Sequence, residues 1–179
     1  MKQFALVTGN VNKHREAERL LGHTLERVEL DLPELQAPTT REVAIAKATT
    51  AHAALTRPVI IEDAGLEFAA LGGFPGPFIK FWETLGGLVS MCRALDGTSD
   101  RRATAVCVLA FVDNAETVGY VEGRTEGTIA TLPRGDHGFG WDAIFIPDGD
   151  TRTFGEMLAH EKDAWSHRGR AWAQLRTKL

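Results

Sequence analysis

Two adjacent carboxylates, Glu62 and Asp63, follow a short run of β-branched apolar residues, Val59-Ile60-Ile61, that comes directly after Pro58. A continuous apolar run bounded by a breaker is typical of a strand buried on both faces. Burying an unpaired carboxylate is very costly, so an acidic pair at the end of such a strand needs a reason. Either the strand reaches the surface and both side chains are solvated, or they bind a metal or act as a base.

Glycines and prolines are interleaved further along, in the stretch 72–77. Such a stretch is poorly suited to a helix or to the interior of a strand, so it predicts a shaped turn with exposed backbone N–H groups. Lys80 follows the turn, with Phe78, Phe81 and Trp82 around it. A cation and aromatic faces beside a carboxylate pair suit a ligand with phosphates, a metal and a flat ring. The alternative is a tight turn whose aromatic side chains pack into the core.

A strand-to-helix turn near the start of the chain is a second candidate. The pattern predicts a strand from Gln3 to Val7 and a helix over residues 12–22, so that Thr8, Asn10 and Lys13 lie on the turn between them. A helix N-terminus offers N–H donors and a positive dipole end to an anion. The Walker pattern is absent, so the turn is not a P-loop. On this evidence alone, an ordinary capped turn is favoured.

The stretch 132–143 predicts an aromatic, glycine-rich loop. Residues 138–143 formally fit the dinucleotide pattern G-x-G-x-x-[GA], but no strand–turn–helix context surrounds them, so we reject that interpretation. The loop carries Phe139, Gly140, Trp141 and Asp142. It indicates either a site that stacks a flat base or a hairpin corner with a core tryptophan.

The last helix is predicted from about His160 to Lys178. Lys162 and Ser166 would share one face of it at a spacing of i, i+4. The stretch Ser166-His167-Arg168 is either a solvated part of this helix or, with Lys162, a cluster of donors aimed at a base. The spacing leaves both alternatives open.

The remaining elements predict the fold class. Residues 24–32 predict a second strand, and Thr40 begins a helix to about Leu55, capped by Thr39 or Thr40. Glu42 lies in the first turn of that helix, where a carboxylate suits the dipole; the functional alternative is a metal ligand near Asp63.

The second half of the chain predicts a helix over residues 86–96 and then two strands, 102–112 and 117–131, joined at Asp113-Asn114 as an antiparallel pair. Helices between early strands followed by a hairpin predict an α/β or α+β fold with a mixed sheet.

Composition limits the class of protein. A chain of 179 residues with 44% hydrophobic residues predicts a single domain over 1–179 with a full core. A net charge of −4 predicts no general affinity for nucleic acid. Cys92 and Cys107, the two cysteines, have no CxxC spacing and fit a reducing, cytoplasmic location. Neither a signal peptide nor an apolar run that could cross a membrane is recognisable.

Taken in order, these motifs resemble the inosine triphosphate pyrophosphatase family over nearly the whole chain. The matching stretches are Thr8-Gly9-Asn10-x-x-Lys13, Glu42, Glu62-Asp63, Leu71-Gly72-Gly73-x-Pro75-Gly76-Pro77-x-Ile79-Lys80, Phe139-Gly140-Trp141-Asp142 and Glu161-Lys162-x-x-x-Ser166-His167-Arg168. Each motif alone is weak, but the ordered set is specific. Two positions depart from the pattern: Ala64 stands where relatives commonly have Ser or Thr, and Asp163 where they often have Asn.

The resemblance implies a fold and a reaction. The fold is an elongated α/β structure in which helices flank a mixed β-sheet and a central cleft lies between two lobes. The reaction is the Mg²⁺-dependent hydrolysis of ITP, dITP and XTP to the monophosphate and pyrophosphate, which clears deaminated purines from the nucleotide pool. The expected partners are a purine nucleoside triphosphate and a second copy of the chain, with no nucleic acid and no membrane.

The resemblance also implies roles. Thr8, Asn10, Lys13 and Lys80 would bind the triphosphate. Glu42, Glu62 and Asp63 would hold Mg²⁺, with Asp63 ranked first as the base that activates water. Phe139 or Trp141 would stack on the purine beside Gly140 and Asp142, and the donors Lys162, Ser166, His167 and Arg168 would recognise its 6-oxo group.

Two constraints accompany these roles. Adjacent residues of a regular strand point to opposite faces, so Glu62 and Asp63 can serve together only if the strand has ended or is bulged there. The rival hypotheses are a nucleotide-binding module without turnover and a pyrophosphatase for other modified nucleotides.

Overall fold

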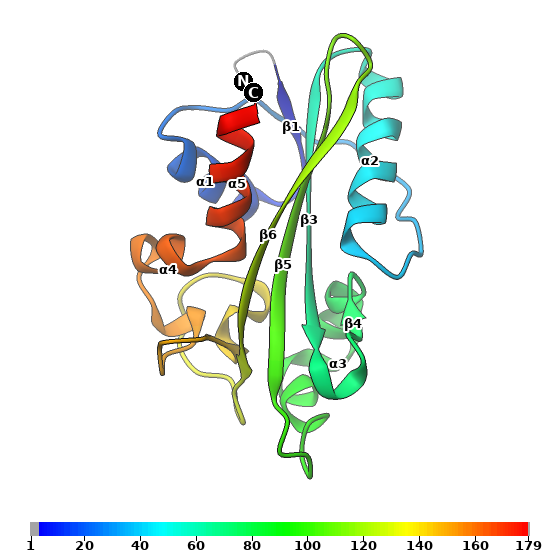
Figure 1. Cartoon of the computed structure of the whole chain (residues 1–179). Helices are drawn as coiled ribbons and strands as arrows, with labels where there is room; N and C mark the ends of the chain where they lie inside the picture. Colours follow the sequence, from blue (N-terminus) through cyan, green and yellow to red (C-terminus); the bar gives the residue numbers. More distant parts are fainter. Residues whose placement is uncertain (1–3, 179) are drawn as a thin grey trace. The chain divides into compact units, whose positions relative to one another are not determined.

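The computed structural model describes residues 4–178, which form a mixed sheet of seven strands flanked by helices (Figure 1). The strands are β1 (Ala5–Val7), β2 (Arg27–Val28), β3 (Val59–Phe68), β4 (Pro75–Gly76), β5 (Arg102–Val112), β6 (Val118–Ile129) and β7 (Phe145–Pro147). The helices are α1 (Val11–Leu21), α2 (Thr40–Leu55), α3 (Ile79–Arg93), α4 (Ala159–Trp165) and α5 (His167–Lys178), with short 3₁₀ turns η1 (Ala69–Leu71), η2 (Gly140–Ile144) and η3 (Phe154–Glu156).

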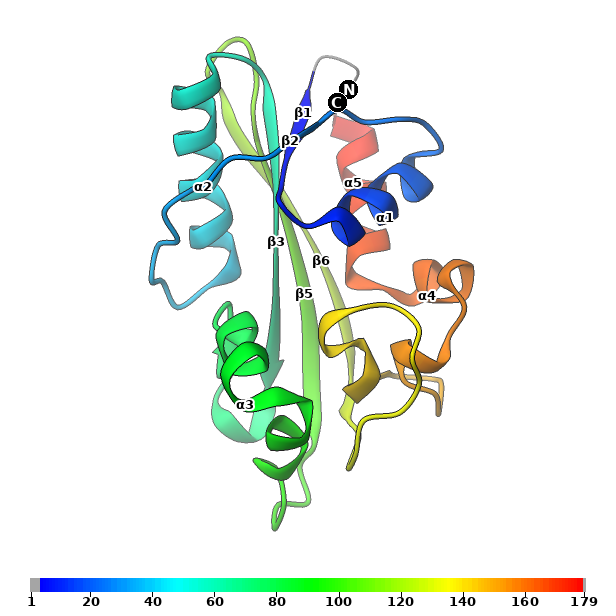
Figure 2. The same ribbon diagram turned by 180° about the vertical axis from the view of Figure 1, so that it is seen from behind.

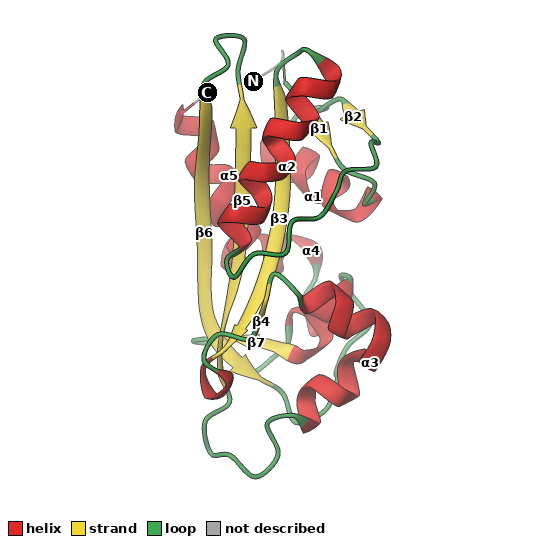
Figure 3. Ribbon diagram, turned by 90° about the vertical axis from the view of Figure 1, so that its right-hand side faces the viewer, coloured by secondary structure: helices red, strands yellow, loops and turns green. Residues whose placement is uncertain are grey.

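The sheet has the strand order β2-β1-β3-β5-β6-β7, and β4 pairs with β3 off this path. The strand β1 is parallel to both β2 and β3, whereas β4 and β7 are antiparallel to their partners. The strands β5 and β6 form the predicted antiparallel hairpin, which Figure 3 shows as two long neighbouring arrows. The predicted α/β class with a mixed sheet is therefore confirmed.

The chain divides into two compact units. Within the described residues, unit 1 comprises 4–64, 107–123 and 168–178, and unit 2 comprises 65–106 and 124–167. In unit 1, α1 and α5 lie on one side of the strands and α2 on the other (Figures 1 and 2). Each unit has its own hydrophobic core, built around Leu6, Ile60 and Trp172 in unit 1 and around Phe68, Phe145 and Phe154 in unit 2.

Local sequence signals fix the two helices of unit 1 that come first in the chain. The side chain of Asn10 accepts hydrogen bonds at the N-terminus of α1, and Gly22 ends the helix in the left-handed conformation with φ 72°. Thr39 caps α2, which covers the predicted range. Capping residues therefore set these boundaries, as the sequence predicts.

Two predicted strands differ from the structure. The strand expected over 24–32 is reduced to β2, because its partner β1 is short and pairs with it only through Leu6 and Val7. The strand expected to stop at the carboxylates continues to Phe68, because β4 pairs with its second half as Leu66↔Gly76 and Glu67↔Pro75. The part of the first strand that was expected at Gln3 lies outside the described residues.

Two predicted helices also differ. The helix expected over 86–96 begins earlier, at Ile79, and is interrupted at Gly87, whose φ of 71° and ψ of 167° are not helical. Lys80, Phe81 and Trp82 therefore lie on the first turns of α3. The single helix expected from His160 to Lys178 is two helices, because Ser166 adopts an extended conformation with ψ 147° between them.

Candidate active site

The end of β1 lies beside the middle of β3 and brings the first two motifs together. The strands β1 and β3 are parallel with Val7 opposite Ile61, so Thr8 follows the end of β1 at the level of Glu62 in β3. In α/β proteins, ligands bind at the carboxyl ends of parallel strands. The end of β1 is therefore the natural place for a site in unit 1.

In the turn after β1, side-chain oxygens accept hydrogen bonds from the backbone N–H groups of the turn itself. Asn10 Oδ1 accepts hydrogen bonds from the backbone N–H groups of Asn12 and Lys13 at 2.9 and 3.2 Å, and Thr8 Oγ1 accepts one from Asn10 at 3.1 Å. The Lys13 ammonium donates to the backbone carbonyl of Glu62 at 3.1 Å, with its side chain 18% exposed. The turn is thus a capped helix start that also places one lysine beside the middle of β3.

Glu62 lies in a buried ionic cluster on the α5 side of β3. Arg168 Nε donates to Glu62 Oε1 at 2.9 Å, Trp172 Nε1 donates to Oε2 at 3.3 Å, and Arg168 also donates to Glu16. The Glu62 side chain is 0% exposed and that of Arg168 is 4% exposed. Burial by itself would lower the pKa of Arg168, but the charges of Glu62 and Glu16 outweigh it and raise the pKa.

This cluster gives two predicted site residues partners within the protein. The carboxylate of Glu62 is bound to protein cations and shielded from solvent, which does not favour its predicted role as a ligand of Mg²⁺. The guanidinium of Arg168 has carboxylate partners in unit 1, and its predicted role in recognising the base stays a prediction. Both residues link β3 to α5.

Asp63 lies on the opposite face of β3, toward α2. Its carboxylate is 3.4 Å from the ammonium of Lys47, and its side chain is 14% exposed. The partners of Glu62 and Asp63 belong to α5 and α2, which lie on opposite sides of the strand (Figures 1 and 2). Because β3 is continuous here, the two adjacent carboxylates follow the alternation of a regular strand and point to opposite faces of the sheet.

Sequence reasoning missed Lys47 and Glu34. The Lys47 ammonium is 2.8 Å from Glu34 Oε1 as well as 3.4 Å from Asp63 Oδ2. Burial by itself would lower the pKa of Lys47, but Asp63 and Glu34 outweigh it and raise the pKa, so the lysine stays charged. A detectable signal was present, because Lys47 adjoins the apolar face of α2 that Ala44 and Ala48 define.

Glu42, expected as a metal ligand, caps its own helix. Its carboxylate accepts a hydrogen bond from Thr39 Oγ1 at 2.6 Å, while its backbone N–H donates to the same hydroxyl at 3.3 Å. Across residues 4–178, no three His, Cys, Asp or Glu side chains are grouped to hold a metal ion. The expected ligand set of Glu42, Glu62 and Asp63 is therefore not brought together.

The aromatic loop of unit 2 is built around a buried ion pair. Asp142 Oδ2 accepts a hydrogen bond from Lys162 Nζ at 2.6 Å and another from the backbone N–H of Phe139 at 2.8 Å. The ammonium of Lys162 also lies 4.9 Å from the centre of the Phe139 ring. The pair thus joins α4 to η2 and fixes the backbone at Phe139, the residue before η2.

The two aromatic side chains of this loop differ in exposure. Trp141 is only 8% exposed and packs against Phe145 and His167, with ring centres 5.8 and 5.1 Å away. Phe139 is partly exposed. Trp141 is therefore part of the core of unit 2, and of the two predicted stacking residues only Phe139 presents a ring at the surface.

The predicted donors lie on two helices and on the residue between them. Ser166 is the C-cap of α4 with an extended backbone, so it lies outside the helix that carries Lys162. Ser166 and His167 are buried in unit 2, whereas Arg168 belongs to unit 1. Lys80 is exposed on the first turn of α3.

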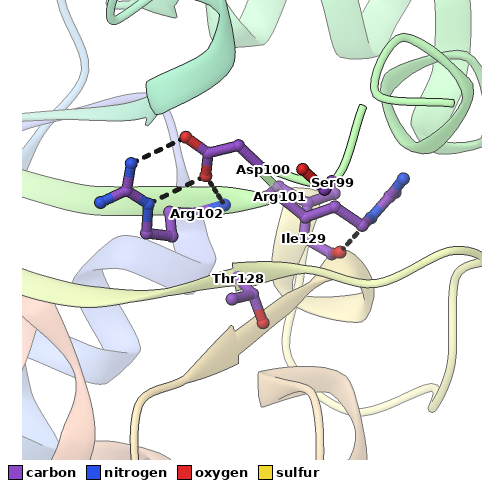
Figure 4. Close-up of a pocket in the computed structure, with 6 residues that line it drawn as sticks. All are labelled: Ser99, Asp100, Arg101, Arg102, Thr128 and Ile129. Carbon is purple, nitrogen blue, oxygen red and sulfur yellow. Dashed lines mark hydrogen bonds and ion pairs between the residues drawn. The ribbon is translucent and has the colours of Figure 1, made fainter. Parts of the chain in front are cut away.

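Figure 4 shows a pocket elsewhere in unit 2. It is lined by Ser99, Asp100, Arg101, Arg102, Thr128 and Ile129. Asp100 accepts two hydrogen bonds from the Arg102 guanidinium, and Arg101 donates to the carbonyl of Ile129. Its charged groups are thus satisfied by one another and by the backbone, and none of the predicted site residues lines it.

The fold and these side chains define an α/β protein with lysines and carboxylates where β1 ends beside β3, and a partly exposed aromatic residue beside a buried ion pair. The chain belongs to the Ham1 family, which it matches over residues 4–178. It is 45% identical to an inosine triphosphate pyrophosphatase of Batrachochytrium dendrobatidis, over 98% of this chain and 93% of that protein. It is 40% identical to a dITP/XTP pyrophosphatase of Methanopyrus kandleri, over 92% of this chain and 89% of that protein.

Solved structures of Ham1 proteins have the same fold as this chain. A HAM1 protein from Coxiella burnetii superimposes with a TM-score of 0.88 at 33% identity, covering 100% of this chain and 98% of that chain. The Staphylococcus aureus Ham1 protein gives a TM-score of 0.82 at 26% identity, covering 99% and 100%. The family resemblance seen in the sequence is therefore confirmed.

Proposed function

We propose that this protein hydrolyses ITP, dITP and XTP to the nucleoside monophosphate and pyrophosphate, and so removes deaminated purines from the nucleotide pool. Full-length relatives that carry the names of these activities support the proposal. The observation that carries it lies where β1 ends beside β3. There the backbone carbonyl of Glu62 accepts a hydrogen bond from the Lys13 ammonium. The carboxylate of the next residue, Asp63, forms an ion pair with the Lys47 ammonium.

The lysines supply the charge that a triphosphate needs. Lys13 and Lys47 are held in unit 1, and Lys80 is exposed in unit 2. Cations and N–H donors stabilise the negative charge that develops on phosphate oxygens during transfer. Thr8 and Asn10 shape the turn that positions Lys13.

Asp63 is the proposed base. Water attacks the α-phosphorus, the bond between that phosphorus and the bridging oxygen breaks, and pyrophosphate leaves. Asp63 takes the proton of the attacking water. Its partly exposed carboxylate suits this role, whereas the buried carboxylate of Glu62 does not.

Mg²⁺ is the proposed cofactor. It is a hard ion that needs one or two carboxylates, completed by phosphate oxygens and water. Glu34 and Asp63 fit this requirement, because both approach one cation, the Lys47 ammonium, in the structure. When bound, the ion would neutralise charge on the phosphates. Glu34 thus replaces Glu42 and Glu62 as the proposed second ligand.

Two residues of unit 2 are proposed to recognise the purine base. Phe139 stacks on the purine, and Lys162, fixed by Asp142, donates to the 6-oxo oxygen of hypoxanthine or xanthine. Adenine has an amino group at that position, so a donor would face a donor. An unpaired buried polar group costs about 1–3 kcal/mol, which disfavours ATP.

A homodimer in the cytoplasm, without nucleic acid or membrane, completes the proposal. Apolar side chains lie exposed along α3 and the turn before it: Phe81 is 54%, Leu85 86% and Phe74 53% exposed. Exposed apolar patches often mark interfaces. Phe78 and Trp82, the other two aromatic residues near Lys80, are partly buried. No helix within residues 4–178 is long and apolar enough to span a membrane.

A panel of nucleoside triphosphates, assayed with and without Mg²⁺, tests the proposal. We expect ITP, dITP and XTP to yield pyrophosphate and monophosphate with Mg²⁺, and ATP and GTP to react much more slowly. Sequential release of orthophosphate would contradict the reaction. Binding without turnover would favour a regulatory module, and activity restricted to other modified nucleotides would favour the second rival.

A further inference from the structure

A carboxylate that the proposed chemistry does not use lies beside the aromatic loop. Glu83 is on α3, which packs against η2. A Cβ built on Gly140 would lie 3.6 and 3.9 Å from the two carboxylate oxygens of Glu83. Gly140 directly follows Phe139, so the carboxylate lies beside the backbone that carries the proposed stacking ring.

Glu83 differs from the other acidic groups of this region because its charge is not compensated. Asp142 is neutralised by Lys162 at 2.6 Å. Glu83 is partly buried, and its carboxylate forms no hydrogen bond or ion pair with another residue in 4–178. Burial, and after it the charge of Asp142, raise the pKa of Glu83. A partly desolvated and uncompensated carboxylate is unfavourable for folding, which points to a functional reason for keeping it.

The charged groups around Glu83 can be enumerated. The 3₁₀ turn η2 contributes Asp142, and α4 contributes Lys162 through its pair with Asp142. On α3 itself, Lys80 lies three residues earlier, without an ion pair to Glu83 within the described chain. The strand β4, which also packs on α3, has no ionisable side chain. Asp142 and Lys162 compensate each other, and the Glu83 carboxylate is left without an ion-pair partner among the described side chains of these elements.

The two oxidised purines respond differently to such a charge. Xanthine loses a ring proton near neutral pH and becomes an anion, because two ring carbonyls stabilise the negative charge. Hypoxanthine, with one carbonyl, stays neutral. A fixed carboxylate repels the xanthine anion and leaves the neutral base nearly unaffected.

We propose that Glu83 is a specificity-determining residue that selects inosine nucleotides over the anionic form of xanthosine nucleotides. This inference rests on the proposed function, because it takes Phe139 as the residue that stacks on the base. It extends that function by ranking its substrates, with ITP and dITP above XTP at slightly alkaline pH.

Steady-state kinetics of Glu83→Gln, which keeps the size of the side chain, test the inference. At about pH 8, the ratio of kcat/KM for XTP to that for ITP should rise about threefold to tenfold over wild type. This rise in the ratio should vanish at acid pH, where xanthine is neutral. It should shrink at high salt, because salt screens the repulsion between the carboxylate and the xanthine anion. Asp96→Asn, which removes an exposed charge beyond α3 in the same unit, should leave the ratio unchanged.

Binding of the products IMP and XMP, measured by tryptophan fluorescence, gives a second readout that does not need turnover. An affinity for XMP that rises relative to that for IMP in Glu83→Gln supports the inference. If no triphosphate is hydrolysed but this ratio still rises, the proposed reaction fails and the role of Glu83 stands. Unchanged ratios in both assays overturn the role of Glu83 and leave the proposed reaction intact. Equal losses for both bases also overturn it, because they indicate a structural role.

Discussion

Arg168 donates a hydrogen bond to Glu62 across 2.9 Å, and both side chains are almost completely buried. The pair joins the last helix, α5, to the middle of β3. Two adjacent carboxylates that look equivalent in the sequence therefore differ in the structure. Glu62 is paired and buried in unit 1, whereas Asp63 lies on the other face of the strand.

The first prediction concerns this pair. Glu62→Gln should lower the free energy of unfolding by about 3–5 kcal/mol, because it leaves the buried guanidinium of Arg168 without one of its charged partners. Urea denaturation measures the loss. In a double-mutant cycle with Arg168→Met, the two effects should be strongly non-additive. Additive effects would show that the pair does not couple β3 to α5.

The second prediction concerns Asp63. Asp63→Asn should lower turnover of ITP by about 10²–10⁴-fold, because the variant cannot take the proton of the attacking water. Its fold should be retained, as judged by circular dichroism, because Asp63 is partly exposed and lies outside the buried cluster. Near-normal turnover in the folded variant would remove Asp63 from the mechanism.

The third prediction separates two candidate metal ligands. Glu34→Gln should raise the Mg²⁺ concentration needed for half-maximal activity at least about tenfold, because the ion loses one of few protein carboxylates. Glu42→Gln, the matched control, should leave that concentration unchanged and cost at most about 1 kcal/mol of stability through the helix cap. The opposite result would restore Glu42 as the ligand.

The fourth prediction separates the two aromatic residues of the loop. Phe139→Ala should weaken ITP binding by about 1–3 kcal/mol, the usual value for stacking between an aromatic side chain and a base. Trp141→Phe should lower thermal stability, because Trp141 is a core residue, and should leave KM nearly unchanged. Kinetics and thermal unfolding of the two variants give both values; a raised KM for Trp141→Phe alone would reverse the assignment.

The fifth prediction concerns assembly. Leu85→Glu places a charge on the most exposed apolar side chain of α3 and should convert a dimer into a monomer in light scattering at micromolar concentration. Val118→Glu, at an exposed apolar residue of β6, should not change the mass. A wild-type protein that is already monomeric would contradict the proposed dimer.

Local signals in the sequence determined much of this molecule. Asn10, Gly22 and Thr39 fixed helix boundaries because caps depend on neighbouring residues only. The ordered motifs were sufficient to recognise the family, and the apolar run before Glu62 predicted the buried strand.

Tertiary structure decided the rest, because partners distant in sequence set the role of each charged group. Lys47 and Glu34 became candidates only when the loop before α2, α2 itself and β3 came together around one ammonium. Trp141 and Phe139 are two residues apart, yet packing against Phe145 buries one ring and leaves the other at the surface. Glu62 and Asp63 are adjacent in the chain, but the continuous strand directs them to opposite faces, where Arg168 binds one and Lys47 the other.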